Sequence, residues 1–295
     1  MSRWKGQSRG NSLGYSIFIF IIRHFPLTFA YTLLRLVSFY FVLFSKKTHQ
    51  YNFFKRVCKT SCIQSFFKIV ENNFLFGQVL VDKIAVLSGC AKNFTYTHEG
   101  IQHIINMKEG GFLIGAHMGN WEIAGELLDK FSVKVNILMY EAERVQIKKL
   151  LDNVQTEKKM NIIPILDDFS HLLLIQQALD RNELIVLHGD RFLENSKSIK
   201  ILFFEKLARF PYGPFYLAAK FKKPISFVFA IKESKKHYHF FASEPKDYPV
   251  LSSISKQYEV VSSIAVDYVC LLEKMVKENP TQWFNFYDFW EEEKD

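Results

Sequence analysis

Residues 110–125 have the sequence GGFLIGAHMGNWEIAG, and this segment gives the strongest indication of the class of fold. Its apolar segment Phe112–Ala116 predicts a buried strand, and the pattern that follows predicts a helix over Trp121–Lys130. Gly119 lies in the short turn between them, and His117 stands where the strand ends. The stretch therefore predicts a strand–turn–helix unit of an α/β domain.

The same alternation continues along the rest of the chain. Four further apolar runs predict strands at Val135–Met139, Ile162–Ile165, Leu184–Leu187 and Ile225–Ala230. Four segments between and after them predict helices at Val145–Lys158, Ser170–Leu179, Pro214–Phe221 and Val260–Glu278. Aliphatic strands separated by helices of about ten residues are typical of an α/β fold with a mostly parallel sheet flanked by helices.

The composition excludes several classes of protein. Apolar residues make up 48% of the 295 residues and charged residues 23%, which is incompatible with a disordered or fibrous chain. The four cysteines form no CxxC pair, so neither a zinc knuckle nor a redox motif is indicated and a reducing compartment fits best. The 16% aromatic content indicates a lipid-facing surface or a large apolar pocket.

The net positive charge lies entirely in the first quarter of the chain. Residues 1–70 carry 11 of the 38 basic side chains and no acidic one, since the first acidic residue is Glu71. A basic arm that binds nucleic acid would be polar, whereas this segment is filled with Phe, Ile, Leu and Tyr. This combination predicts attachment to an anionic lipid surface and argues against a nucleic-acid partner.

Two apolar runs in this quarter indicate how the chain meets the membrane. Leu13–Ile22 is the first, and Leu27–Phe44 would form a helix nearly as long as the hydrocarbon layer is thick. Arg35 in the middle of the second run disfavours a lipid-exposed span. We therefore expect these segments to form helices that lie in the cytoplasmic leaflet. The alternative is that they form an ordinary pair of buried helices. Residues 1–88 are predicted to form this region, and residues 89–295 the α/β domain.

His117 is the best candidate for catalysis because it lies beyond the carboxyl end of a strand, where ligands bind in open parallel sheets. Histidine is the side chain best suited to take a proton from a hydroxyl near neutral pH. Glu122 could hold the imidazole in one tautomer, and N–H groups at the start of the helix near Asn120 could stabilise an oxyanion. The spacing alone is weak, since His239 also has a glutamate, Glu244, five residues later in what reads as a strand and loop.

The segment Gly115–Glu122 closely resembles the His-x4-Glu block of the bacterial late acyltransferases of lipid A biosynthesis. These enzymes belong to the lysophospholipid and glycerolipid acyltransferase superfamily. The resemblance extends over nearly the whole chain, through the segments Trp4–Gly6, Leu187–Arg191, Phe210–Pro214, Lys223–Pro224 and Asn279–Trp283.

The resemblance implies an acyltransferase on the cytoplasmic face of the bacterial inner membrane. It would move a fatty acyl chain from acyl carrier protein to a hydroxyl of a lipid A precursor, with His117 as general base and Glu122 as its orienting partner. Asn120, Asp190 and Arg191 are expected to bind substrate, with the Arg191 guanidinium suited to a phosphate. A structural Asp–Arg pair that closes a loop is the alternative for the last two.

The chain departs from that family near the acceptor site. Additional arginines that suit a phosphorylated disaccharide are replaced by the segments Met139–Arg144 and Leu166–Ser170, and a Phe-x-Gly-Lys pattern appears as Phe203–Lys206. Another acceptor, an aminolipid or a pigment, therefore stays open, as do a lipid or thioester hydrolase that uses the same pair and a noncatalytic lipid-binding protein. The missing serine or cysteine elbow disfavours the hydrolase.

No cofactor is expected. Gly110-Gly111 lacks the continuation of a nucleotide-binding loop. A metal site built from His117, His188, His237 and His239 is disfavoured because the last two lie on what reads as a solvated strand. The aromatic cluster between Trp283 and Trp290 is assigned to the core by default, with a membrane-interface belt or an acyl-pocket wall as alternatives.

Overall fold

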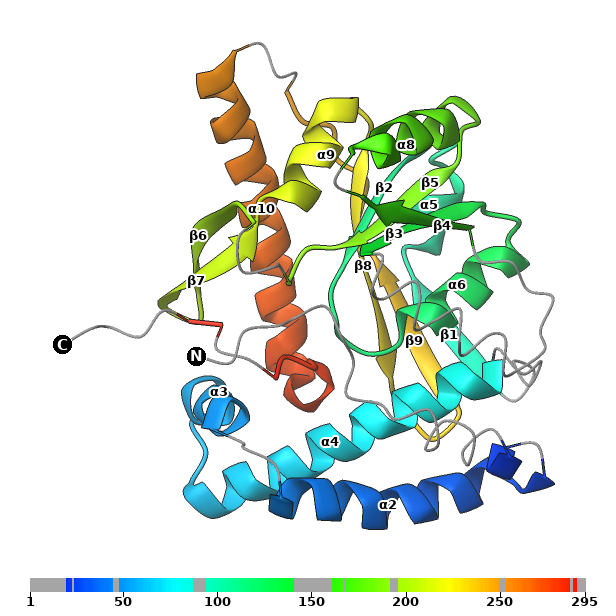
Figure 1. Ribbon diagram of the computed structural model, residues 1–295, viewed down its shortest axis with the longest axis vertical. Helices are drawn as coiled ribbons and strands as arrows, with labels where there is room; N and C mark the ends of the chain where they lie inside the picture. Colours follow the sequence, from blue (N-terminus) through cyan, green and yellow to red (C-terminus); the bar gives the residue numbers. More distant parts are fainter. Residues whose placement is uncertain are drawn as a thin grey trace.

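In the computed structural model a seven-stranded sheet runs through the described part of the chain in the order β1-β9-β8-β2-β5-β3-β4 (Figure 1). The described residues are 20–22, 24–44, 48–86, 94–140, 161–166, 168–191, 196–249, 253–286 and 289–290. The strands of this sheet are β1 (Thr95–Glu99), β2 (Gly111–Gly115), β3 (Val135–Tyr140), β4 (Asn161–Ile165), β5 (Leu184–His188), β8 (Ile225–Lys232) and β9 (His237–Ala242). All neighbouring strands are parallel except β8 and β9.

Helices cover both faces of the sheet, as Figure 1 shows. One face carries α5 (Ile101–Ile105) and α6 (Trp121–Lys130), and the other carries α8 (Ser170–Asp180), α9 (Gly213–Phe221) and α10 (Ile254–Glu278). Strand β2 serves both cores, since Phe112 and Ile114 pack with the α9–α10 side while Leu113 packs with the α5–α6 side. The predicted α/β fold is confirmed. The helix predicted at Val145–Lys158 lies outside the described residues.

A small hairpin lies apart from the main sheet. It pairs β6 (Ser198–Phe203) with β7 (Lys206–Pro211) in antiparallel register. Its Phe203 carbonyl accepts a hydrogen bond of 2.8 Å from the indole Nε1 of Trp290, and its apolar side chains join the core around α10. Neither this hairpin nor the edge strand β1, whose TYTHE sequence is mostly exposed, was predicted from the sequence.

Within the described residues the helices α2 (Leu27–Phe44), α3 (Thr48–Cys58) and α4 (Cys62–Ala85) come before the sheet. The predicted helix over Leu27–Phe44 is confirmed, whereas most of Leu13–Ile22 lies outside the described residues. Helix α4 begins at a capping box in which the Ser61 hydroxyl accepts from the Gln64 amide and the Gln64 side chain accepts from the Ser61 amide. The boundary between residues 88 and 89 stays a prediction.

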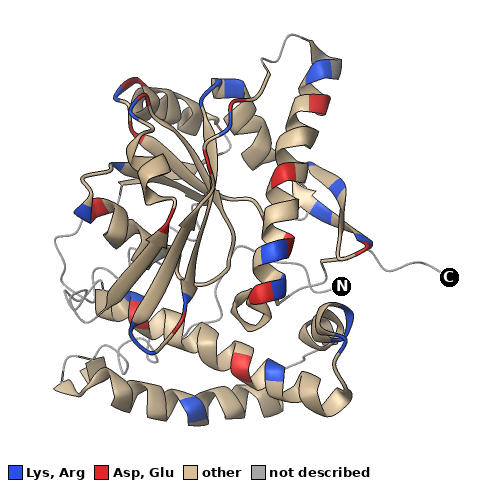
Figure 2. Cartoon of the chain, turned by 180° about the vertical axis from the view of Figure 1, so that it is seen from behind, with Lys and Arg blue, Asp and Glu red and all other residues tan. Residues whose placement is uncertain are grey.

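Helix α2 lies along the outer side of α4, at the bottom of Figure 1. Its inner face packs against the protein through Leu27, Ala30, Tyr31, Leu34, Ser38 and Val42. Its outer face exposes large apolar side chains, namely Phe29, Leu36, Phe39, Tyr40, Phe41, Leu43 and Phe44. In the described part of the chain α2 is the one helix long and apolar enough to cross a bilayer, with 33% of its length buried. Figure 2 shows it nearly free of charged residues.

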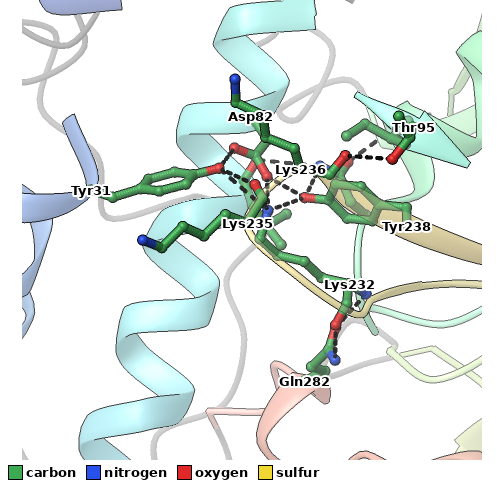
Figure 3. A network of polar contacts seen from close by, with 11 residues as sticks. Tyr31, Asp82, Thr95, Lys232, Lys235, Lys236, Tyr238 and Gln282 are labelled. Carbon is green, nitrogen blue, oxygen red and sulfur yellow. Dashed lines mark hydrogen bonds and ion pairs between the residues drawn. The ribbon is translucent and has the colours of Figure 1, made fainter. Parts of the chain in front are cut away.

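A buried polar network joins these helices to the sheet (Figure 3). The Asp82 carboxylate of α4 lies 2.5 Å from the Lys232 ammonium at the end of β8. It also accepts hydrogen bonds from the hydroxyls of Tyr31 on α2 and Tyr238 on β9. Burial raises the pKa of Asp82 and lowers that of Lys232, although each charge favours the other. The network therefore ties α2, α4, β8 and β9 together at a single buried carboxylate.

Candidate active site

The loop between β2 and α6 carries His117 and is shaped by Gly119. Gly119 has a φ of +63°, and a Cβ at this position would lie 1.8 Å from the Ala230 carbonyl oxygen. Only glycine fits such a position, because other residues would meet both backbone strain and a clash. The loop can therefore lie directly against β8, where the Asn120 amide donates to the Ala230 carbonyl at 2.8 Å.

Asn120 begins helix α6. Its side-chain oxygen accepts from the Ile123 amide at 3.3 Å, which is the usual role of an N-cap residue. Its amide nitrogen lies 3.4 Å from the Tyr238 hydroxyl, and the residue is fully buried. The structure thus shows Asn120 as a cap, and its expected contact with substrate stays a prediction.

His117 pairs with Asp190, 73 residues further along the chain. The imidazole Nδ1 lies 2.7 Å from Asp190 Oδ1, and the backbone N–H of His117 donates to Asp190 Oδ2 at 2.9 Å. Asp190 is 1% exposed, whereas the His117 side chain keeps 19% of its surface exposed. Among the described residues no hydrogen bond reaches the imidazole Nε2. A buried carboxylate therefore orients the ring, and the other nitrogen is left for a substrate.

The pairing follows from the sheet. Strands β2 and β5 are parallel neighbours, and Gly115 lies opposite His188. His117 and Asp190 each come two residues after these positions, so both stand at the same carboxyl edge. The sequence analysis placed both residues just past predicted strands but did not pair them.

The expected orienting partner was Glu122, which lies in the first turn of α6. Its side chain is outside the described part of the structure. A contact between Glu122 and His117 stays a prediction, and the observed carboxylate at Nδ1 is that of Asp190.

The electrostatics of the pair favour a charged Asp190. Burial alone would raise the pKa of its carboxyl, but the charge interaction and hydrogen bond with His117, together with the nearby Arg191 charge, outweigh burial, so the pKa lies below its usual range. The His188 ring contacts the His117 ring at a tilt of 56°, with the ring centroids 4.3 Å apart. Burial, together with the neighbouring His117, lowers the pKa of His188 to about 3, so this second imidazole is neutral near pH 7.

Arg191 contacts the C-terminal segment. Its Nη2 donates to the backbone carbonyl of Phe284. It lies next to Asp190 and contributes to the lowered pKa described above. The expected contact of Arg191 with a substrate phosphate stays a prediction.

Residues 281–284, which we call the C-terminal strap, hydrogen-bond to the loop that carries His117. The Gly119 N–H donates to the Gln282 carbonyl at 3.0 Å, and the Phe284 N–H donates to the His117 carbonyl at 2.9 Å. The indole Nε1 of Trp283 donates to Asp190 Oδ2 at 3.2 Å. The buried Trp283 is thus a third member of the His117–Asp190 arrangement.

The strap is itself held by the N-terminal helices. The Asn72 side chain of α4 donates to the Thr281 carbonyl at 2.8 Å and to the Trp283 carbonyl at 3.2 Å. The sequence analysis assigned Trp283 to the core by default. Its fully buried ring confirms that assignment, while its hydrogen bond to Asp190 was missed. The sequence gives no indication of this contact, because Trp283 is far along the chain from both His117 and Asp190.

The described residues contain no group of three or more His, Cys, Asp or Glu side chains able to hold a metal ion. His237 and His239 lie on β9, where they hydrogen-bond to Thr95 and Thr97 of β1 at 2.7 and 2.9 Å. Of the histidines considered for a metal site, His188 alone is shown to contact His117.

Comparison with known proteins gives the family. The model of the bacterial lipid A biosynthesis acyltransferase family matches residues 12–292. Curated proteins give no match. Among solved structures the chain is similar to the 1-acyl-sn-glycerophosphate (LPA) acyltransferase PlsC from Thermotoga maritima, with 13% identity over 83% of this chain and 98% of that chain. Its TM-score of 0.37 is too low for this likeness to carry an argument. The family match over nearly the whole chain is sufficient: the chain is an acyltransferase of the bacterial lipid A biosynthesis acyltransferase family.

Proposed function

We propose that this protein transfers a fatty acyl chain from acyl carrier protein to a hydroxyl of a lipid A precursor, with His117 as the general base. The observation that carries the proposal is the imidazole held at Nδ1 by the buried Asp190 while part of the ring stays exposed. Membership of the family supports the lipid acceptor and the acyl donor.

The reaction follows from the geometry of the pair. His117 Nε2 takes the proton of the acceptor hydroxyl as its oxygen attacks the thioester carbonyl, and a carbon–oxygen bond forms. The negative Asp190 stabilises the imidazolium. When the tetrahedral intermediate collapses, the carbon–sulfur bond breaks and His117 gives its proton to the leaving thiolate. Glu122 stays a proposed second carboxylate at this site.

The oxyanion needs donors that the structure has not already used. The N–H groups of Gly119 and Asn120 donate to the carbonyls of Gln282 and Ala230. The Ile123 amide is engaged by the Asn120 cap. We therefore assign oxyanion stabilisation to the N–H groups of Trp121 and Glu122 in the first turn of α6, at the positive end of the helix.

We place the enzyme on the cytoplasmic face of the inner membrane. The exposed apolar face of α2 supports this position, since a row of large apolar side chains on an outer helix would otherwise face water. The basic N-terminal quarter supports attachment to anionic lipid.

The test is transfer by the purified full-length protein, with acyl carrier protein loaded with a fatty acid and a lipid A precursor, read by mass spectrometry of the product. His117→Ala should lower the rate by about a hundredfold to ten-thousandfold, the range that general-base catalysis contributes. His239→Ala is the matched control, because His239 hydrogen-bonds to Thr97 on the edge strand, and it should retain the wild-type rate.

Three results would change the proposal. Full activity of His117→Ala would show that His117 is not the general base. Acylation of an aminolipid or pigment in place of the lipid A precursor would keep the base and change the acceptor. Release of free fatty acid by the wild type without any acceptor would make the protein a hydrolase.

A further inference from the structure

A cavity of about 320 Å³ lies between α2, α4 and the turn that joins β8 to β9. Polar and charged side chains form much of its wall, among them Thr28, Thr32, Arg35, Gln78, Ser234 and Lys235. Neither His117 nor Asp190 contributes to it. The cavity is therefore separate from the reaction centre, and its volume is at the lower end for small-ligand sites.

Two cations reach this cavity from segments 200 residues apart, Arg35 on α2 and Lys235 on the β8–β9 turn. Figure 3 shows the Lys235 side chain extending toward α2, beside Tyr31. The Arg35 guanidinium lies 5.5 Å from the centroid of the Phe74 ring. Among the described residues no carboxylate lies within ion-pair distance of either cation. The two charges are thus available to an anion.

The other charged groups of the cavity are already engaged. The Lys232 ammonium is buried and paired with Asp82. The Glu233 carboxylate lies 3.3 Å from the His237 Nε2. The Thr28 hydroxyl, on the exposed side of α2, adds a group that can donate to a phosphate oxygen, whereas the Thr32 hydroxyl already donates to the Thr28 carbonyl at 3.0 Å.

The cavity also lies beside the apolar outer face of α2. Helix α2 contributes Arg35 to the cavity and exposes Leu36, Phe39 and Leu43. A ligand with an anionic head and apolar tails would place its head in the cavity and its tails along that face. An arginine within an apolar helix is costly in a lipid environment unless its charge is matched. A bound anion at Arg35 would match it.

We propose that this cavity binds the phosphodiester headgroup of an anionic bilayer phospholipid, through Arg35 and Lys235. The inference rests on the membrane attachment in the proposed function. It assigns to Arg35 a role in lipid recognition that is independent of the acyl-transfer reaction.

The experiment is flotation of the full-length protein with vesicles of phosphatidylcholine alone or mixed with phosphatidylglycerol, at physiological salt. Arg35→Gln and Lys235→Gln should each reduce the preference for the mixed vesicles about fivefold. This is the change in affinity expected when one basic residue near an anionic surface loses its charge. The matched control is Lys236→Gln, since Lys236 is exposed on the same turn but does not line the cavity. It should keep the wild-type preference.

Three outcomes would overturn the proposal. An equal loss in all three variants would mean diffuse surface attraction. Displacement from vesicles by millimolar glycerol phosphate would mean a site for soluble phosphate. Unchanged flotation of Arg35→Gln with a raised KM for the acceptor would mean that the cavity belongs to the acceptor site. Transfer activity is not needed in this assay, so an inactive protein that still prefers the mixed vesicles would refute the proposed function alone.

Discussion

At the scale of single residues, Asp190 contacts His117 through both of its carboxylate oxygens. One oxygen holds Nδ1, and the other accepts the His117 backbone N–H and the Trp283 indole. The carboxylate thus fixes the loop and the ring together. Such a shared contact makes the position of the His117 imidazole, the proposed base, depend on its neighbours.

Trp283→Phe tests this dependence, because it removes one donor to Asp190 and keeps an aromatic ring. Without that donor the Asp190 carboxylate is held less firmly, so the imidazole that it orients is less well positioned for proton transfer. The kcat of acyl transfer should therefore fall about tenfold while the KM changes little. Trp290→Phe is the matched control, since its indole donates to the Phe203 carbonyl in the same aromatic cluster. An equal kcat for both variants would limit Trp283 to packing.

At the scale of elements, the turn between β2 and α6 depends on Gly119. Gly119→Ala should cost about 2 kcal/mol or more of unfolding free energy, because its φ of +63° is unfavourable for alanine and the new Cβ meets the Ala230 carbonyl. Activity should fall further, since the displaced loop carries His117.

Gly125→Ala is the control for that change. A Cβ there has no atom within 4 Å, and the residue lies inside α6. It should raise the unfolding free energy by about 0.5–1 kcal/mol. Urea titration of both variants checks the pair of predictions, and equal stability of the two would contradict the role of the turn.

The sequence predicts well those elements whose burial requires a run of apolar residues. The interior strands β2, β5 and β8 are aliphatic runs between turns, and the observed bounds of α6 coincide with the predicted helix. The edge strand β1 is short and polar, so it lacks that pattern. The partner of His117 was not predictable from spacing, because it depends on which strand lies beside β2.

At the scale of the whole molecule, the Asp82–Lys232 pair joins the N-terminal helices to the sheet. Lys232→Met should lower the unfolding free energy by about 3–5 kcal/mol, because it leaves a buried carboxylate without its cation. The double variant Lys232→Met, Asp82→Asn should recover at least half of that loss, since no uncompensated charge remains.

The surface pair of Lys246 with Asp267 is the control, since both side chains keep a third or more of their surface exposed. Lys246→Met should change the unfolding free energy by less than about 1 kcal/mol. Chemical denaturation of the detergent-solubilised protein measures all three variants. A Lys232→Met protein as stable as wild type would show that the network does not hold the two parts together.

The C-terminal strap has a consequence for biosynthesis. The loop that carries His117 completes its hydrogen bonds only with residues 282 and 284. During translation β2 and β5 emerge long before these residues, so a nascent chain can form much of the sheet while its reaction centre is incomplete. Because Asn72 of α4 donates to the Thr281 carbonyl of the same strap, the site also requires the N-terminal helices to dock. Acyl transfer should therefore begin only after the sheet and the N-terminal helices have come together, which keeps partly made chains from consuming acyl donor.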